Sequence, residues 1–190
     1  IIVCYLTIFL AMIMCFILPS KLPYYLSEMN APSIMSGVFL GVQGVCNAVT
    51  SLSFRRISAA IERFKLLAIA FIFLGISLCL LYLPHSYAYI AVSMVFAGIG
   101  MGIISPTVST TLASQSVAKT SGKIMGGYST ALNLGQFSAT LVIIPIMAVM
   151  GTYSGLFLVI GVIALIIGII YGVTSLFLER SNSKKKQVSA

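Results

Sequence analysis

Most of the side chains that could do chemistry in this sequence are amides and hydroxyls set inside long apolar runs. Two sets recur at intervals of three and four residues: Gln43, Asn47 and Thr50, and then Ser129, Asn133, Gln136 and Thr140. At that spacing each set lies on one face of a helix. A polar side chain in an apolar medium is costly, so it turns toward a neighbouring helix or a water-filled cavity. Two interpretations stay open for each set: hydrogen-bonding glue between helices, or the wall of a cavity that binds a small molecule.

Titratable and metal-ligating side chains are scarce. The acids are Glu28, Glu62 and Glu179, the one histidine is His85, and the four cysteines lie in apolar runs without metal or CxxC spacing. All three acids fall outside the apolar runs. A single histidine without a second ligand does not make a metal site, and the sequence offers neither paired acids nor a serine–histidine arrangement. We therefore expect no catalytic residue, no metal and no cofactor, and we predict that the protein is not an enzyme.

The composition indicates a membrane protein. Of 190 residues, 59% are hydrophobic and 7% are charged, and the mean hydropathy is +1.12. A soluble domain averages about 25% charged residues, so this chain could not cover a water-facing surface. The net charge is +8, but the basic residues punctuate apolar runs and form no stripe on a polar face, which excludes a nucleic-acid partner. A polytopic membrane protein, with membrane lipid as a partner, is the class that remains.

Six apolar segments predict an all-α bundle of transmembrane helices. We place them at about 2–25, 34–54, 66–83, 87–113, 124–150 and 155–178. A helix needs ~20 residues to cross the hydrocarbon layer, and the runs lack the alternation of β-barrel strands. We predict one six-helix domain over 1–178, followed by a basic cytoplasmic tail over 179–190 that is disordered.

Glycine and proline predict where the helices pack or bend. In the second segment a stripe of small residues suits a close neighbour; it comprises Gly37, Gly41, Gly44, Ala48 and Ser51. In the fourth, Pro106 removes the hydrogen bond to the carbonyl of Gly102, and Gly98 lies one turn earlier. This motif is interpreted either as tight packing or as a hinge. Pro19 and Pro23 are expected to bend or end the first helix, and Ser33 could cap the second.

The distribution of polar residues predicts which helices face lipid. Segments 66–83 and 155–178 are nearly free of polar groups and are expected to face lipid. The second, fourth and fifth segments carry the polar and glycine-rich faces and are expected to face the interior. Tyr24 and Tyr25, near the outer end of the first segment, could line a vestibule or anchor the helix at the interface.

The basic residues predict the orientation. If the N-terminus is cytoplasmic, the loops 55–65 and 114–123 and the tail receive ten of the eleven basic residues, and the other side receives only Lys21. The first of these basic loops contains Arg55, Arg56, Arg63 and Lys65. Positive residues favour the cytoplasmic side, so both termini are predicted to be cytoplasmic. The run Lys184–Lys186 either contacts anionic lipid head groups or acts as a solvated stop signal.

Six helices with both termini inside resemble one half of a major facilitator superfamily transporter. Several motifs are similar to the C-terminal half, helices seven to twelve, of bacterial efflux-type members. They are 51–57 (SLSFRRI) with 62–65 (ERFK) for the basic loop between helices eight and nine, 98–106 (GIGMGIISP) for helix ten, and 121–128 (SGKIMGGY) with 133–136 (NLGQ) for helix eleven. Within the last motif, Gly122 and Gly126 are packing or hinge candidates.

The resemblance implies a secondary active transporter of the cell (inner) membrane that exports a small molecule, with proton coupling, by alternating access. It implies a cavity lined by the first, second, fourth and fifth helices. The cavity candidates are Gln43, Asn47, Asn133, Gln136, Tyr24 and Tyr25. It also implies a partner, an N-terminal six-helix half that carries the proton-binding acid. Because the chain begins with Ile1 at an apolar run, we expect a fragment. The alternative is a half-size or structural membrane subunit without transport activity of its own.

Overall fold

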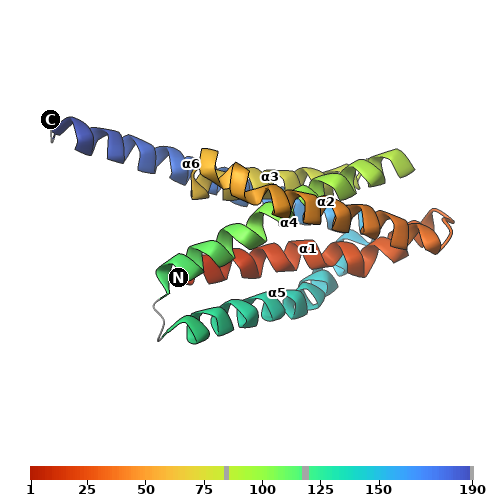
Figure 1. The fold of residues 1–190 in the computed structure, drawn as a ribbon. Coiled ribbons are helices and arrows are strands. Elements are labelled where there is room, and N and C mark those ends of the chain that lie inside the picture. Colours follow the sequence, from red (N-terminus) through yellow and green to blue (C-terminus); the bar gives the residue numbers. More distant parts are fainter. Residues whose placement is uncertain (84–85, 117–119, 189–190) are drawn as a thin grey trace.

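Six long helices make up the fold of the computed structural model (Figure 1), which describes residues 1–83, 86–116 and 120–188, with side chains through 177. The helices are α1 (Ile2–Glu28), α2 (Ile34–Ala60), α3 (Arg63–Leu80), α4 (Tyr87–Gln115), α5 (Ser121–Met150) and α6 (Tyr153–Val188). All six are long and apolar enough to cross a membrane. No strand occurs among the described residues, and the predicted all-α, six-helix membrane fold is confirmed.

The prediction of a basic loop over 55–65 is wrong, because only Ile61 and Glu62 separate α2 from α3. Arg55 and Arg56 lie on the last turns of α2, while Arg63 and Lys65 lie on the first turn of α3. The chain from 55 to 60 contains arginine and alanine, which are good helix formers, and neither glycine nor proline. The polar composition marked where the apolar span ends, but the helix continues beyond it.

The same difference occurs at the C-terminal end, where α6 continues to Val188 instead of ending at 178. No glycine or proline follows Gly172, so nothing in the sequence stops the helix. The tail predicted at 179–190 is therefore helical through 188, and the expectation of disorder there is wrong. The predictions made for His85, Lys119 and the side chains of 179–190 lie outside the described part of the structure.

Two smaller expectations concern helix ends: Pro19 and Pro23 were expected to bend or end the first helix, and Ser33 to cap the second. α1 continues through Pro19 and Pro23 to Glu28, so neither proline ends it. Proline is tolerated in a transmembrane helix because neighbouring groups satisfy the freed carbonyl. Ser33 precedes α2 but its side chain makes no capping hydrogen bond.

The helix contacts branch at α4 and leave α2, α5 and α6 with one main partner each. α3 packs against both α4 and α6, α4 packs against α2, and α1 packs mainly against α5 and less against α4. α2 and α5 are the least buried of the six spans. Figure 1 shows α2, α1 and α5 on the viewed face, with part of α4 between α2 and α1. The prediction that α2 and α5 face an interior is not met within this chain, because their partner helices cover only one side of each.

A close helix crossing joins α2 and α4, and glycine on α4 permits it. A Cβ atom built on Gly98 would lie 2.5 Å from the carbonyl oxygen of Gln43, and one on Gly102 would lie 2.7 Å from the Cβ of Thr50. By contrast, a Cβ on Gly37, on Gly41 or on Gly44 meets nothing within 4 Å. The small-residue stripe of α2 therefore faces away from this bundle, and its polar stripe faces α4.

A second glycine seam joins α3 and α6, which the sequence placed against lipid. A Cβ on Gly161 would lie 2.7 Å from the Sγ of Cys79, and one on Gly75 would lie 2.7 Å from the Cγ of Leu165. Half of the α3 span is buried, so the expectation of a lipid-facing helix is wrong for α3. α6 packs one face on α3 and exposes the other, which carries Ile166, Ile169, Ile170, Val173 and Phe177.

Candidate functional site

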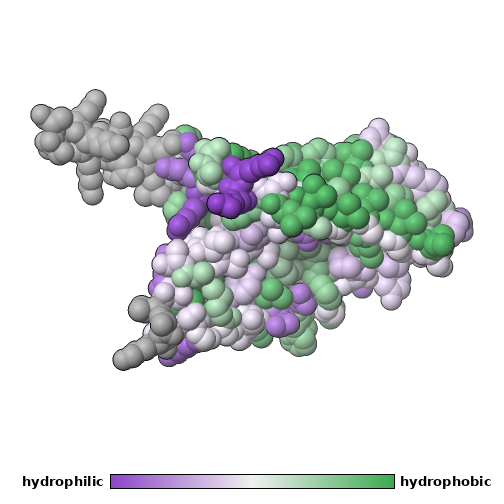
Figure 2. Space-filling view, in the orientation of Figure 1, coloured by the Kyte–Doolittle hydropathy of each residue, from purple (hydrophilic) through white to green (hydrophobic). Residues whose placement is uncertain are grey.

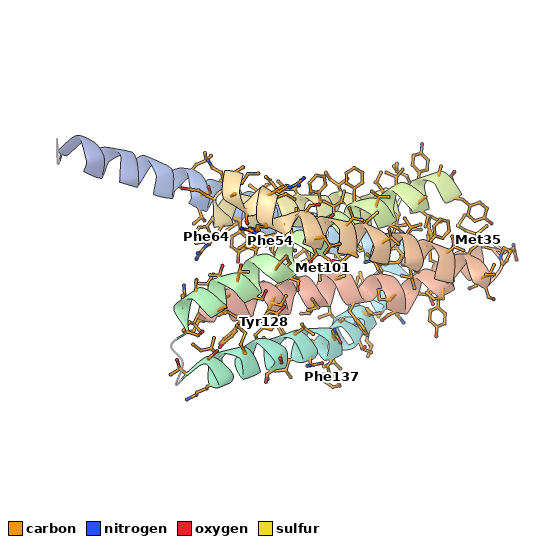
Figure 3. All side chains as sticks on the ribbon, in the orientation of Figure 1. Met35, Phe54, Phe64, Met101, Tyr128 and Phe137 are labelled. Carbon is orange, nitrogen blue, oxygen red and sulfur yellow. The ribbon has the colours of Figure 1, made fainter. Side chains whose placement is uncertain are left out.

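The face formed by α2, α1 and α5 carries most of the polar residues that the sequence singled out. In Figure 2 apolar residues gather over α2, strongly hydrophilic residues gather where α2 ends, and α5 is paler. One side of α5 is exposed along most of its length and mixes polar and apolar residues: Gly126, Thr130, Asn133, Phe137, Thr140 and Ile144. Figure 3 shows Phe137 pointing away from the bundle. This face has no covering partner among the described residues.

Gln43 of α2 and Gln136 of α5 approach α1 from opposite sides. The Nε2 atom of Gln43 lies 3.7 Å from the Sγ of Cys15, and the Nε2 atom of Gln136 lies 3.9 Å from the Sδ of Met12. Thiol and thioether sulfur are weak acceptors, and both glutamines are only half-buried. Within the described residues these amides thus have weak partners only, which leaves their donors and acceptors able to bind a ligand or water.

The two asparagines differ in their surroundings. Asn133 is exposed, and its Nδ2 donates to the backbone oxygen of Ser129, 2.7 Å away on the same helix. Asn47 is half-buried at the crossing with α4, where a Cβ on Gly102 would lie 2.8 Å from its backbone oxygen. The structure therefore presents Asn133 to the open face and places Asn47 beside the packed seam.

The neighbouring tyrosines of α1 have opposite roles. Tyr25 is 1% exposed; its hydroxyl donates to the backbone oxygen of Leu81 at 3.0 Å, and its ring meets the edge of Phe157. Tyr25 is a core residue, and its prediction as a cavity residue is wrong. Tyr24 is 54% exposed, stacks on Tyr153 with 6.0 Å between ring centroids, and has the Nζ of Lys21 at 5.2 Å. Adjacent helical residues point about 100° apart, which lets Tyr25 face the core while Tyr24 faces outward.

The hinge and packing candidates on α4 and α5 also differ in their surroundings. α4 stays helical through Pro106, and the hydroxyl of Thr110 donates to the backbone oxygen of Pro106 at 2.6 Å. No described residue comes within 4 Å of a Cβ built on Gly122 or on Gly126, so neither packs against the described part of the chain.

Sequence reasoning missed the glycines that hold α5 on α1. A Cβ on Gly135 would lie 2.6 Å from the backbone oxygen of Phe9, and one on Gly127 would lie 2.7 Å from the hydroxyl of Tyr5. That hydroxyl donates to the backbone oxygen of Ile124 at 2.9 Å. The eight-residue spacing of Gly127 and Gly135 places them on nearly one side of the helix. This spacing is the sequence signal that could have identified them as packing positions.

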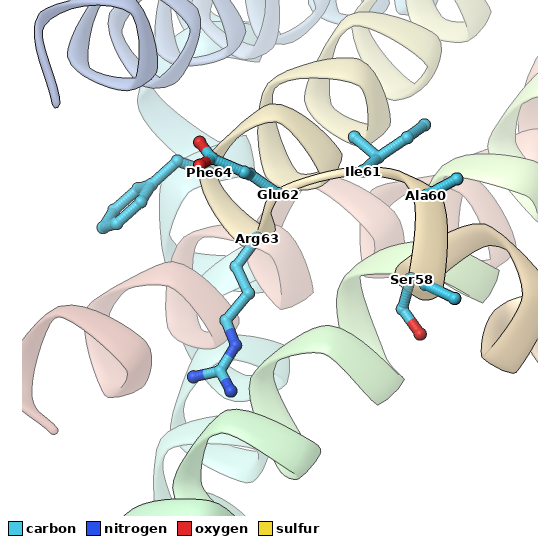
Figure 4. Close-up of a pocket in the computed structure, with 7 residues that line it drawn as sticks. Ser58, Ala60, Ile61, Glu62, Arg63 and Phe64 are labelled. Carbon is cyan, nitrogen blue, oxygen red and sulfur yellow. The ribbon is translucent and has the colours of Figure 1, made fainter. Parts of the chain in front are cut away.

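A shallow hollow of about 590 Å³ lies where α2 ends and α3 begins, and Arg63 is the basic residue among the described residues that line it. Figure 4 shows this hollow, with the side chain of Arg63 extending away from Glu62 and Phe64. Arg55 and Arg56 are exposed and Lys65 is half-buried. In the described residues, no three histidine, cysteine or acidic side chains come together as a metal site requires.

The family model of the Major Facilitator Superfamily matches residues 4–190 of the chain. The search of curated proteins finds no match.

Proposed function

Because the chain belongs to the major facilitator superfamily, a family of membrane transporters, we propose that it forms the C-terminal six-helix half of a secondary transporter that exports a small molecule by alternating access. The observation that carries this proposal is the open face of α2, α1 and α5. On that face Gln43 and Gln136 flank α1 with sulfur atoms as their partners, and Asn133 is exposed. These amides are proposed as the polar groups of the substrate path.

A second six-helix half is the proposed partner for the open face. Small residues in a membrane let another helix approach closely. Gly37, Gly41 and Gly44 of α2 are exposed with nothing within 4 Å of a built Cβ, and one side of α5 is exposed as well. Two helices at opposite edges with uncovered faces are the arrangement that a second half could close around a cavity.

Proton coupling is proposed to depend on a residue of that second half. Coupling requires a titratable group within the membrane. Glu28 is the last residue of α1 and Glu62 lies between α2 and α3, while Glu179 follows the apolar run 155–178 of the sequence. This half would then supply cavity wall and packing, and the partner half would supply the proton-carrying acid.

We expect single cysteines on the open face to react with a charged, water-soluble thiol reagent in the full-length transporter cleared of its native cysteines. Asn133→Cys should react at least about tenfold faster than Ile169→Cys, because a thiol in hydrocarbon forms little thiolate. Both side chains are exposed in this chain, and Ile169 lies on the α6 surface. Reaction rates are measured by mass shift at timed quenching.

Buried Ala139 on the same helix as Asn133 provides the matched control, since Ala139→Cys should not react. Gln43→Cys and Gln136→Cys should react more slowly than Asn133→Cys. If cysteines at 43, 133 and 136 all remain as unreactive as Ala139→Cys while transport persists, the amides are packing devices and the proposed substrate path is wrong.

We propose that the end of the bundle bearing Arg55, Arg56 and Arg63 faces the cytoplasm of a cell with an inner membrane. Alkaline phosphatase, which works only outside the cytoplasm, should then be active when fused after Asn30 and inactive when fused after Ala190. Exposed Asn30 lies in the turn between α1 and α2. Activity after Ala190 would reject the proposed orientation. Fusions matched for expression by immunoblotting give the comparison.

A further inference from the structure

A cavity of about 550 Å³ lies between α1, α3, α4 and α6 at the end of the bundle where α1 begins. It is separate from the open face, because none of the four candidate amides lines it. Its volume falls in the range of about 300–1,000 Å³ that is usual for sites of small molecules. Apolar side chains supply much of its wall, among them Cys4, Leu67, Val108 and Ile170.

The cavity reaches the surface in two directions. Exposed Val3 of α1 and exposed Ile170 of α6 border it on the side of the bundle. Exposed Arg63 and Gln115 border it at the end of the bundle. An apolar side opening would face hydrocarbon chains, whereas the end opening lies at the level of the basic residues that mark the membrane interface.

The polar groups of the cavity gather at the end opening. Arg63 is the only charged residue among the described residues that line it, and Gln115 and Thr111 lie at the same end of α4. Deeper in the cavity, Thr7 donates to the backbone oxygen of Val3 and shares a hydrogen bond with the hydroxyl of Tyr171. Because these hydroxyls satisfy each other, the deep end requires no polar group from a ligand.

We propose that this cavity binds one anionic membrane phospholipid. An acyl chain enters between α1 and α6 and occupies the apolar part, and the phosphate lies against the guanidinium of Arg63. Arginine matches phosphate geometry with two parallel hydrogen bonds. Charge complementarity favours an anionic lipid, since Arg63 is the charged side chain among the described residues that line the cavity. A soluble phosphate would contact only exposed Arg63 and leave the apolar wall unfilled.

The test is native mass spectrometry of the full-length chain in detergent, with phosphatidylglycerol and phosphatidylcholine of identical acyl chains added in turn. Arg63→Ala should weaken phosphatidylglycerol binding about tenfold, as the loss of a charged hydrogen-bonding partner does. Arg55→Ala removes the same charge from an exposed site outside the cavity and should change binding less than about twofold. Thr111→Phe, which fills the cavity from α4, should reduce binding of phosphatidylglycerol although all charges remain.

Three results would overturn the proposal. Equal losses for Arg63→Ala and Arg55→Ala would indicate diffuse attraction to a basic surface. Unchanged binding by Thr111→Phe would place the lipid outside the cavity. Full displacement of the lipid by millimolar glycerol 1-phosphate would mean that the head group alone is bound. If Arg63→Ala fails to fold, Arg63→Lys, which keeps the charge without the paired donors, replaces it and should lose part of the affinity.

Discussion

Gly98→Ala is expected to destabilise the bundle by about 2 kcal/mol, within the range typical of overpacked cores. The added Cβ would lie 2.5 Å from the carbonyl oxygen of Gln43 and 2.6 Å from the Cβ of Cys46. Both of these atoms belong to α2, so the clash can be relieved only if α2 and α4 move apart. That movement would also displace Gln43 from Cys15 and disturb the proposed substrate path.

Gly44→Ala is the matched control for this substitution. Gly44 lies on α2, and a Cβ there meets nothing within 4 Å. Alanine is the better helix former by about 1 kcal/mol, so Gly44→Ala should leave the free energy of unfolding unchanged or raise it. Unfolding of the purified chain in mixed micelles of increasing SDS content gives both values. Equal stability of Gly98→Ala and the unmodified chain would refute the close α2–α4 crossing.

Tyr25→Ala is expected to lower the free energy of unfolding by about 3 kcal/mol, as large-to-small substitutions of buried aromatic residues do. Tyr25 is 1% exposed, packs against Phe157 and donates a hydrogen bond to Leu81. Its removal would leave a void where α1 meets the end of α3 and the start of α6. Tyr24→Ala should cost less than about 1 kcal/mol, because its ring is 54% exposed.

Tyr25→Phe separates the two contributions of the Tyr25 side chain. It keeps the ring and removes the hydroxyl, and a single hydrogen bond within a membrane protein contributes about 0.6 kcal/mol. The same SDS titration should rank Tyr25→Ala as the least stable, with Tyr25→Phe and Tyr24→Ala both within about 1 kcal/mol of the unmodified chain. A Tyr24→Ala protein less stable than Tyr25→Ala would reverse the assignment of core and surface.

The positions of the six helices along the chain could be predicted from hydropathy, because only a helix satisfies its backbone over ~20 residues of hydrocarbon. Helix ends could not. α2 continues past 54 to Ala60, and α6 continues past 178 to Val188. A change from apolar to polar side chains marks the edge of the membrane, whereas a helix ends where the backbone is interrupted.

Periodicity also identified helix faces without identifying what covers them. The stripes of Gly98 and Gly102 on α4 and of Gly37, Gly41 and Gly44 on α2 have similar spacing, yet only the first is packed within this chain. The sequence identified Gln43 and Gln136 as amides that turn toward a neighbouring helix or a cavity. Their positions on either side of α1 depend on α1 lying between α2 and α5.

The sequence by itself determined that this protein is a bundle of six membrane helices, and it contained the motifs that resemble the major facilitator superfamily, a family that the match over residues 4–190 establishes. Local composition suffices for this because every helix lies in the same apolar solvent, the hydrocarbon of the membrane. The tertiary structure alone decided that Tyr25 is core while Tyr24 is surface, and that Gly161 is packed while Gly122 is open. Such contacts depend on the rotation and approach of helices distant in sequence, which no single segment encodes.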